Sequence, residues 1–284
     1  AGAEGKEFAE LAAKGGDVPI FALGSGSDYS AFLEHLGIAS LDIGFGGEDD
    51  NAGIYHSRYD SFDHYIRFGD PDFAYGVALA KVAGRIMLRT ANARVLPMRF
   101  GDFSNTFDRY AGELKKLVEN TRKATRRQHM LLDRHAFTLN SDPTRPIAAP
   151  QRESDVPTNI DLAPLENATK RLDKSAQAFQ AAYAARAADG FELAAHTRNQ
   201  INTMMLRMEQ ALTDQDGLPG RPWFRHMVYA PGMLTGYGVK TIPGVREALE
   251  GRRWDEANRY SAITAKVIDG YCAQLDKLTG LLAK

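Results

Sequence analysis

The sequence has almost no cysteine, and this scarcity excludes several kinds of site. Of its 284 residues only one is a cysteine, Cys272. A single thiol forms no intramolecular disulfide and builds no cysteine-rich zinc knuckle. The compartment stays open, because large exported proteins also fold without disulfides.

Long apolar runs and a surplus of charge of one sign are missing as well. No stretch of about 18 apolar residues occurs, so we expect no membrane segment in this chain. The formal net charge is -1. A near-neutral chain has no global field for nucleic acid or acidic lipid, and we predict neither as a partner. The basic run at 122–127 has no interleaved aromatic residues and is typical of a solvated helix face.

Several common motifs are also absent. No histidine pair has the i, i+4 spacing of a zincin helix, and no serine stands in a Gly-x-Ser-x-Gly elbow. Glycines 24 and 26 lack the third glycine of a dinucleotide fingerprint. That segment is either a tight turn capped by Asp28 or an anion site at a helix N-terminus. Glu48-Asp49-Asp50 lacks EF-hand spacing and is typical of a solvated loop rather than a calcium site.

The first hundred residues alternate short apolar runs with helical patterns, which is typical of an α/β layer. Strands are expected at Val18–Leu23 and Ile38–Phe45, with a helix between them that starts at Ser27 or Asp28 and runs to about Leu36. That helix carries Phe32, Leu33 and Leu36 on one face. Asp70-Pro71 predicts the start of a long helix. Its apolar positions suit burial: Phe73, Val77, Val82, Ile86 and Met87.

Beyond residue 95 the apolar period changes to 3 and 4, which predicts amphipathic helices. They are expected over residues 107–121, 162–183, 193–212 and 263–282, with a polar, proline-rich break at 141–157. Helices of this length are typical of bundles. The sequence therefore predicts two domains. Residues 1–95 form the tail of an α/β domain, and residues 96–284 form an all-α four-helix bundle.

Several segments match one family in the same order: residues 23–28 (LGSGSD), 36–40 (LGIAS), 55–62 (YHSRYDSF), 68–71 (FGDP), 217–219 (GLP), 229–231 (YAP) and 242–244 (IPG). The chain resembles the C-terminal part of a glutamate carboxypeptidase II-like zinc peptidase. The match runs from about Val18 to the end. It implies the tail of a zinc-exopeptidase domain followed by a transferrin receptor-like dimerisation domain.

The resemblance implies two zinc ions in the complete parent protein. His56 matches the family's last zinc ligand, and Tyr55 matches a tyrosine that hydrogen-bonds the tetrahedral intermediate. Gly26 and Asp28 would line the substrate cleft, and Tyr237 matches a pocket tyrosine that the helical domain supplies. The family's other ligands and its general-base glutamate lie upstream of the matched segment. This chain alone is therefore expected to bind zinc weakly at most and to be inactive.

The pocket positions depart from the family pattern. Asp42 and Gly44 stand in place of two arginines that recognise glutamate, and Gly236 replaces a lysine beside Tyr237. We therefore expect a peptide substrate that does not end in glutamate. The resemblance also implies a homodimer through the helical domain. It favours a periplasmic or secreted parent.

Two other functions stay open beside the peptidase. One is a receptor-like relative that kept the fold and lost catalysis, as the transferrin receptor did, and the other is an independent helical dimerisation module. The transferrin receptor lacks the histidine at this place, whereas Tyr55-His56-Ser57 is intact here. The intact motif favours an enzyme parent. Without the resemblance, a lone histidine such as His56 is more simply explained by a bond to a backbone carbonyl.

Overall fold

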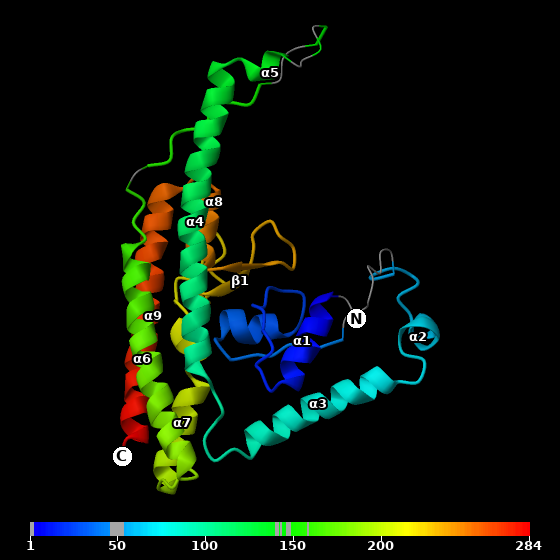
Figure 1. Ribbon diagram of the computed structural model, residues 1–284, viewed down its shortest axis with the longest axis vertical. Coiled ribbons are helices and arrows are strands. Elements are labelled where there is room, and N and C mark those ends of the chain that lie inside the picture. Colours follow the sequence, from blue (N-terminus) through cyan, green and yellow to red (C-terminus); the bar gives the residue numbers. More distant parts are fainter. Residues whose placement is uncertain (1–2, 46–53, 140–141, 143, 146–148, 158) are drawn as a thin grey trace. The chain divides into compact units, whose positions relative to one another are not determined.

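The computed structural model describes residues 3–45, 54–139, 142, 144–145, 149–157 and 159–284 (Figure 1). The chain divides into two compact units. The first comprises Ala1–Ala22 and Leu41–Pro97, and the second comprises Leu23–Ser40 and Met98–Lys284. The acidic loop Glu48-Asp49-Asp50 lies outside the described residues.

Long amphipathic helices build the second unit. They are α4 (Phe100–Asp133), α6 (Ala163–Ala188), α7 (Ala195–Leu206) and α9 (Trp254–Leu282). The helix α6 packs along α9, and α4 packs on α6, as Figure 1 shows. A short helix, α5 (Ala136–Leu139), follows α4. The four predicted helices are therefore present, and their arrangement as a four-helix bundle stays a prediction.

The core of this unit lies where the apolar faces of the helices meet. The rings of Phe100 and Phe179 meet edge to face, with 4.9 Å between their centroids. Large side chains of the helices that are at most 1% exposed include Phe107, Leu114, Leu165, Leu172, Phe179, Ile201, Leu275 and Leu278. Burial of such side chains supplies the main driving force for folding. Among the described helices none is both long and apolar enough to cross a membrane.

A hairpin and a short helix complete the second unit. Strand β1 (Tyr229–Pro231) pairs antiparallel with β2 (Val239–Thr241), and Tyr229 lies opposite Thr241. Residues 232–238 connect the strands and are called the Tyr237 loop below. This loop is closed by the Gly232 N–H, which donates to the Gly238 carbonyl at 2.9 Å. The short helix η3 (Glu209–Leu212) precedes the hairpin, and α8 (Pro243–Glu250) follows it and packs on α9.

The segment 23–40 contributes a short helix in which Tyr29 and Ser30 are α-helical and η1 (Ala31–His35) continues as a π-helical turn. The expected helix is therefore present, and no side chain caps η1 at Ser30. The expected apolar face is right for Leu33, which is buried, and wrong for Phe32 and Leu36, which are 50% and 49% exposed, while Glu34 is buried instead. The wider π-turn changes which residues share a face, so a 3.6-residue period assigns the wrong ones.

The first unit has little buried surface. It contains α1 (Ala3–Ala13), α2 (Phe62–His64), η2 (Tyr65–Gly69) and α3 (Ala74–Ala91). Among its described residues, only Asp70, Val95 and Leu96 are buried. Asp70 precedes α3 and accepts the N–H groups of Tyr75 and Gly76, as a capping residue does. The expected burial of the apolar positions of α3 is wrong: Phe73, Val77, Val82, Ile86 and Met87 are 40–70% exposed.

Neither strand expected in the first hundred residues forms. Val18–Leu23 and Ile38–Phe45 have no regular secondary structure, and β1 with β2 makes the one sheet of the described residues. A strand needs a neighbour to satisfy its backbone N–H and C=O groups, and these segments have none here. The α/β layer and the division at residues 95 and 96 therefore stay predictions.

Candidate functional site

The Tyr55-His56-Ser57 motif forms a tight turn in the first unit. The N–H and the hydroxyl of Ser57 both donate to the Ile54 carbonyl, at 3.0 and 2.7 Å. The His56 N–H donates to Asp60 Oδ2 at 3.1 Å. These bonds hold His56 at a φ of 59°, in the left-handed region that few residues with a Cβ occupy. Such a conformation recurs at functional sites.

The side chains of this turn face solvent. Tyr55 is 65% exposed, and its ring stacks on the imidazole of His56 with 3.8 Å between the centroids. His56 is exposed as well. An accessible imidazole is a common zinc ligand, and a tyrosine beside it is placed to donate a hydrogen bond to the same bound group.

The described residues do not form a complete metal centre. No three His, Cys, Asp or Glu side chains among them lie close enough to hold an ion. A catalytic zinc ion needs about three protein ligands. His56 therefore fits the role of one ligand, and any zinc site that includes it takes further ligands from outside the described residues.

Two predicted pocket residues meet in the second unit. Gly26 has a φ of 100°, and a Cβ added to it would lie 2.6 Å from Cδ1 of Tyr237. The Ser25 N–H donates to the Tyr237 carbonyl at 3.1 Å, and a Cβ on Gly24 would lie 2.0 Å from that carbonyl oxygen. Both glycines are thus required for residues 24–26 to lie against the Tyr237 loop. An anion bound at this turn could not use the Ser25 N–H, because that group is already bonded to the Tyr237 carbonyl.

The Tyr237 loop presents an uncharged surface. Tyr237 is 57% exposed, and Met233 and Leu234 in the same loop are 54% and 95% exposed. Residues 232–238 include no charged side chain. An uncharged surface of this kind suits an apolar group better than a carboxylate.

The two predicted acidic pocket residues are both exposed. Asp28 lies in the turn before η1, in the same unit as Tyr237. Asp42 lies in an irregular segment of the first unit, which also contains His56. Among the predicted site residues, the structure therefore pairs Tyr55 with His56 by stacking and Gly26 with Tyr237 by contact.

An ion pair behind the hairpin was missed by the sequence analysis. Arg221 Nη2 donates to Glu247 Oε2 at 2.5 Å, and Nη1 donates to the Pro231 carbonyl. Glu247 Oε1 accepts the Met233 N–H at 2.6 Å. The side chains of Arg221 and Glu247 are only 12% and 13% exposed. This pair anchors the start of the Tyr237 loop to α8, and no local sequence period reports a contact between such distant residues.

His226 is a structural histidine at the base of the hairpin. It is fully buried, and its Nδ1 accepts the N–H groups of Val228 and Tyr229 at 3.2 and 3.0 Å. Its proton is therefore assigned to Nε2, which donates to Glu209 Oε1 at 3.0 Å. With both nitrogens engaged, this imidazole is not available to a metal.

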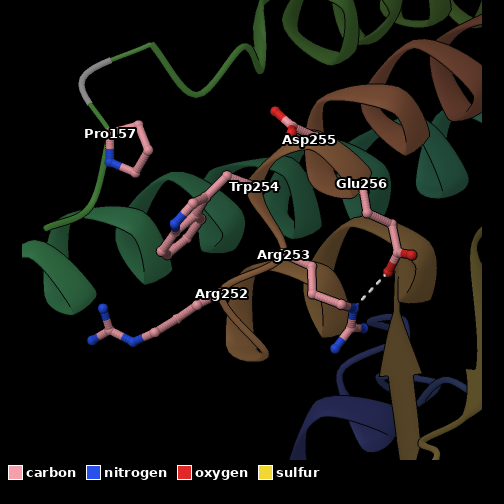
Figure 2. Close-up of a pocket in the computed structure, with 6 residues that line it drawn as sticks. All are labelled: Pro157, Arg252, Arg253, Trp254, Asp255 and Glu256. Atoms are coloured by element: carbon pink, nitrogen blue, oxygen red, sulfur yellow. Dashed lines mark hydrogen bonds and ion pairs between the residues drawn. The ribbon is translucent and has the colours of Figure 1, made fainter. Parts of the chain in front are cut away.

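An open hollow lies at the N-terminal end of α9 (Figure 2). It is lined by Pro157, Arg252, Arg253, Trp254, Asp255 and Glu256. Arg253 Nε donates to Glu256 Oε1 at 2.8 Å, the dashed line of Figure 2. Arg252 pairs with Glu153 and donates to Thr125 Oγ1 at 2.7 Å. Because acids already engage both guanidinium groups, the hollow is poorly suited to an anion, and it includes none of the predicted site residues.

Comparison with known families identifies the helical part of the chain. Residues 160–276 match the transferrin receptor-like dimerisation domain. This range begins just before α6, includes the hairpin and α8, and ends within α9.

Comparison with individual proteins extends the similarity to most of the chain. It is 33% identical over 253 residues to a probable glutamate carboxypeptidase of Arthroderma benhamiae, covering 88% of this chain and 29% of that protein. It is 30% identical over 230 residues to a probable glutamate carboxypeptidase of Arabidopsis thaliana, covering 81% and 27%. Aminopeptidase NAALADL1 of Rattus norvegicus is 25% identical over 275 residues, covering 91% and 31%. The chain thus spans less than a third of the length of these relatives.

Proposed function

Because this chain belongs to the family of glutamate carboxypeptidase II-like peptidases, we propose that it supplies one metal ligand, part of the substrate cleft and the dimer interface of a zinc-dependent exopeptidase. The proposal concerns the complete protein. This chain alone holds one of the ligands that such a site requires.

The observation that carries the proposal is the turn around His56. Its imidazole is accessible, its backbone is held at a φ of 59°, and Tyr55 stacks on it. Exposure and a positive φ also occur at His135, so what sets His56 apart is the tyrosine that stacks on it within the family motif. The intact turn therefore favours an enzyme over the receptor-like alternative.

The exposed face of α3 supports the idea that the first unit is one part of a larger α/β domain. Val82 and Ile86 lie one turn apart on this helix and are 47% and 40% exposed. Apolar positions with helical spacing normally face a core.

The residues of this chain would then have separate roles. Bound zinc would polarise the scissile carbonyl and lower the pKa of a water molecule. His56 would hold the metal, and the Tyr55 hydroxyl would donate a hydrogen bond to the developing oxyanion. Gly26 and Tyr237 would form a wall for the terminal residue of the peptide.

We further propose that this terminal residue is not glutamate. The Tyr237 loop is uncharged, and Gly236 lies beside the tyrosine. Asp42 would repel an acidic side chain if it lay in the cleft. A neutral or apolar residue fits these groups better. The same family match supports a homodimer formed through the helical unit.

The proposal is tested by peptide hydrolysis in the complete protein, with zinc present. His56→Ala is expected to lower kcat/KM by about 100-fold or more, since even loss of a residue that only supports a ligand costs 10–100-fold. His135→Ala is a matched control, because His135 is also exposed and also has a positive φ, 51°. Unchanged activity in His56→Ala contradicts the metal role. Faster cleavage of peptides ending in glutamate than of neutral ones contradicts the proposed specificity.

A further inference from the structure

Glu34, in η1, is a fully buried acid. Neither oxygen of its carboxyl group has a hydrogen-bond partner. Buried polar groups in folded proteins are nearly always bonded, so this exception needs a physical explanation. A neutral carboxyl group tolerates such a place far better than a carboxylate, because only the carboxylate loses the solvation of a full charge.

The charge of Arg221 and the backbone of Arg225 both act on Glu34. The carbonyl of Glu34 accepts the Arg225 N–H at 2.8 Å, and the Arg221 charge acts on the Glu34 carboxyl group. The Nε atoms of both arginines are buried without a partner. The structure therefore keeps a buried acid within the field of the Arg221 guanidinium without forming an ion pair between them.

The other titratable groups on the elements around Glu34 are already bonded. His226, whose N–H donates to the Glu34 carbonyl at 3.1 Å, and Glu209 of η3 bond each other through their side chains. On η1 itself, His35 Nδ1 donates to the Trp223 carbonyl at 2.7 Å. None of these groups forms a hydrogen bond with the Glu34 carboxyl group.

Arg221 links Glu34 to the Tyr237 loop. Its other donors hold the Pro231 carbonyl and Glu247, and Glu247 in turn holds the Met233 N–H. At the opposite end of the same loop, the Tyr237 carbonyl accepts the Ser25 N–H. The segment 23–40 thus contacts the loop twice, once directly through residues 24–26 and once through Glu34 and Arg221.

We propose that Glu34 is a positioning residue: while its carboxyl is neutral it leaves Arg221 bonded to Glu247 and Pro231, and when it ionises it draws Arg221 away and loosens the Tyr237 loop. The ionised group needs either the guanidinium of Arg221 or water. Either one disturbs the packing of η1 on the segment 209–228. In the proposed peptidase, whose pocket this loop would edge, the fit of the substrate would therefore depend on pH.

The direction of the pH effect follows from where the proton is held. Burial raises the pKa of Glu34 from 4.5 to about 8, and Arg221 opposes this rise only in part. The packed state thus holds its proton more tightly than the open state. The packing of η1 is strongest below pH 4.5. Above that pH the equilibrium constant for opening rises about tenfold per pH unit, and it levels off near pH 8.

Amide hydrogen exchange on the full chain between pH 5.5 and 9 tests the proposal. After correction for intrinsic exchange, the amides of Ser25, Arg225 and Met233 should lose about tenfold in protection per pH unit up to about pH 8. Glu34→Gln, which fixes the neutral form, should make this profile flat. His35 and His226 are present in both proteins, so any contribution that they make is the same on the two sides of the comparison.

Glu113→Gln serves as the matched control. Glu113 pairs with Arg246 in the same unit and lies 38% exposed, so this variant should keep the wild-type slope. A slope that survives in Glu34→Gln, or a flat wild-type profile, overturns the proposal. If Glu34→Gln does not fold, carboxyl NMR of the wild-type chain decides: a Glu34 midpoint near 8 supports the proposal, and one near 4.5 overturns it. Neither measurement involves peptide cleavage, so failure here leaves the proposed function standing, and the reverse also holds.

Discussion

The two units of this chain use apolar side chains in opposite ways. In the second unit the apolar positions of α4, α6 and α9 are buried, with Leu114, Leu172 and Leu275 at 0% exposure. In the first unit α3 carries a similar spacing of apolar residues, yet Met87 and Leu88 are 70% and 64% exposed. A helical period therefore predicts a helix in both places, whereas burial depends on whether a second apolar face is present.

This difference separates two sources of stability. The second unit has its own core and a cooperative set of helix contacts, which is the condition for independent folding. The first unit buries few side chains among its described residues. Such a region gains little from hydrophobic burial, and its stability should come mainly from whatever covers it.

One substitution made in both units gives the largest expected contrast. Leu275→Ala removes a fully buried side chain of α9 and should lower the free energy of unfolding by about 3 kcal/mol, within the range for buried leucines. Leu88→Ala on α3 should change it by less than about 0.5 kcal/mol. Urea unfolding followed by far-ultraviolet circular dichroism, to which the helices of both units contribute, measures the two effects.

Equal effects in these two variants would show that the comparison is wrong. A large loss in Leu88→Ala would mean that α3 is buried in solution by another copy of the chain. Repeating the measurement at several protein concentrations separates that case, because burial between copies depends on concentration.

The helices of the second unit could be predicted because their apolar period is long and regular. The short elements could not. The strands β1 and β2 are three residues each, and η1 breaks the 3.6-residue period, so Glu34 was not expected to be buried. The strands predicted at 18–23 and 38–45 failed for another reason: a strand depends on a partner that the sequence of the strand itself does not specify.

Some residues of the candidate site could be predicted from the sequence. His56 and Tyr55 came from a motif, and no composition rule would have found them. The contact of Gly26 with Tyr237 joins residues 211 positions apart, and the family resemblance alone pointed to both. Arg221 and Glu34 act through long-range packing, for which a single sequence holds no local signal.

Ion pairs give a second contrast between the two units, with an expected change in the free energy of unfolding smaller than that of Leu275→Ala. Arg221→Met leaves Glu247, which is 13% exposed, without its cation, and should cost about 2 kcal/mol, below the 3–5 kcal/mol of fully buried pairs. Arg67→Met in the first unit breaks a pair with Asp63 in which both side chains are about two-thirds exposed. That change should cost no more than about 0.5 kcal/mol. The unfolding free energies of the two variants decide, and a loss below 1 kcal/mol in Arg221→Met would contradict the anchoring role.

Glycine substitutions give the smallest and most local contrast, with opposite signs expected in the two units. Gly26→Ala places a Cβ at a φ of 100° and against the ring of Tyr237, so it should cost about 1–2 kcal/mol. Gly84→Ala, inside α3, meets no atom within 4 Å and should stabilise that helix by up to about 1 kcal/mol.

Amide hydrogen exchange measures the effects of the two glycine substitutions separately. The Ser25 amide, which donates to the Tyr237 carbonyl, should exchange faster in Gly26→Ala, whereas the amides of α3 should exchange more slowly in Gly84→Ala. The two variants thus separate a position that needs the backbone freedom of glycine, Gly26, from one that does not, Gly84. Unchanged Ser25 exchange in Gly26→Ala would mean that the ring of Tyr237 moves aside at no cost, and the contact between the two predicted pocket residues would then not define the shape of the pocket.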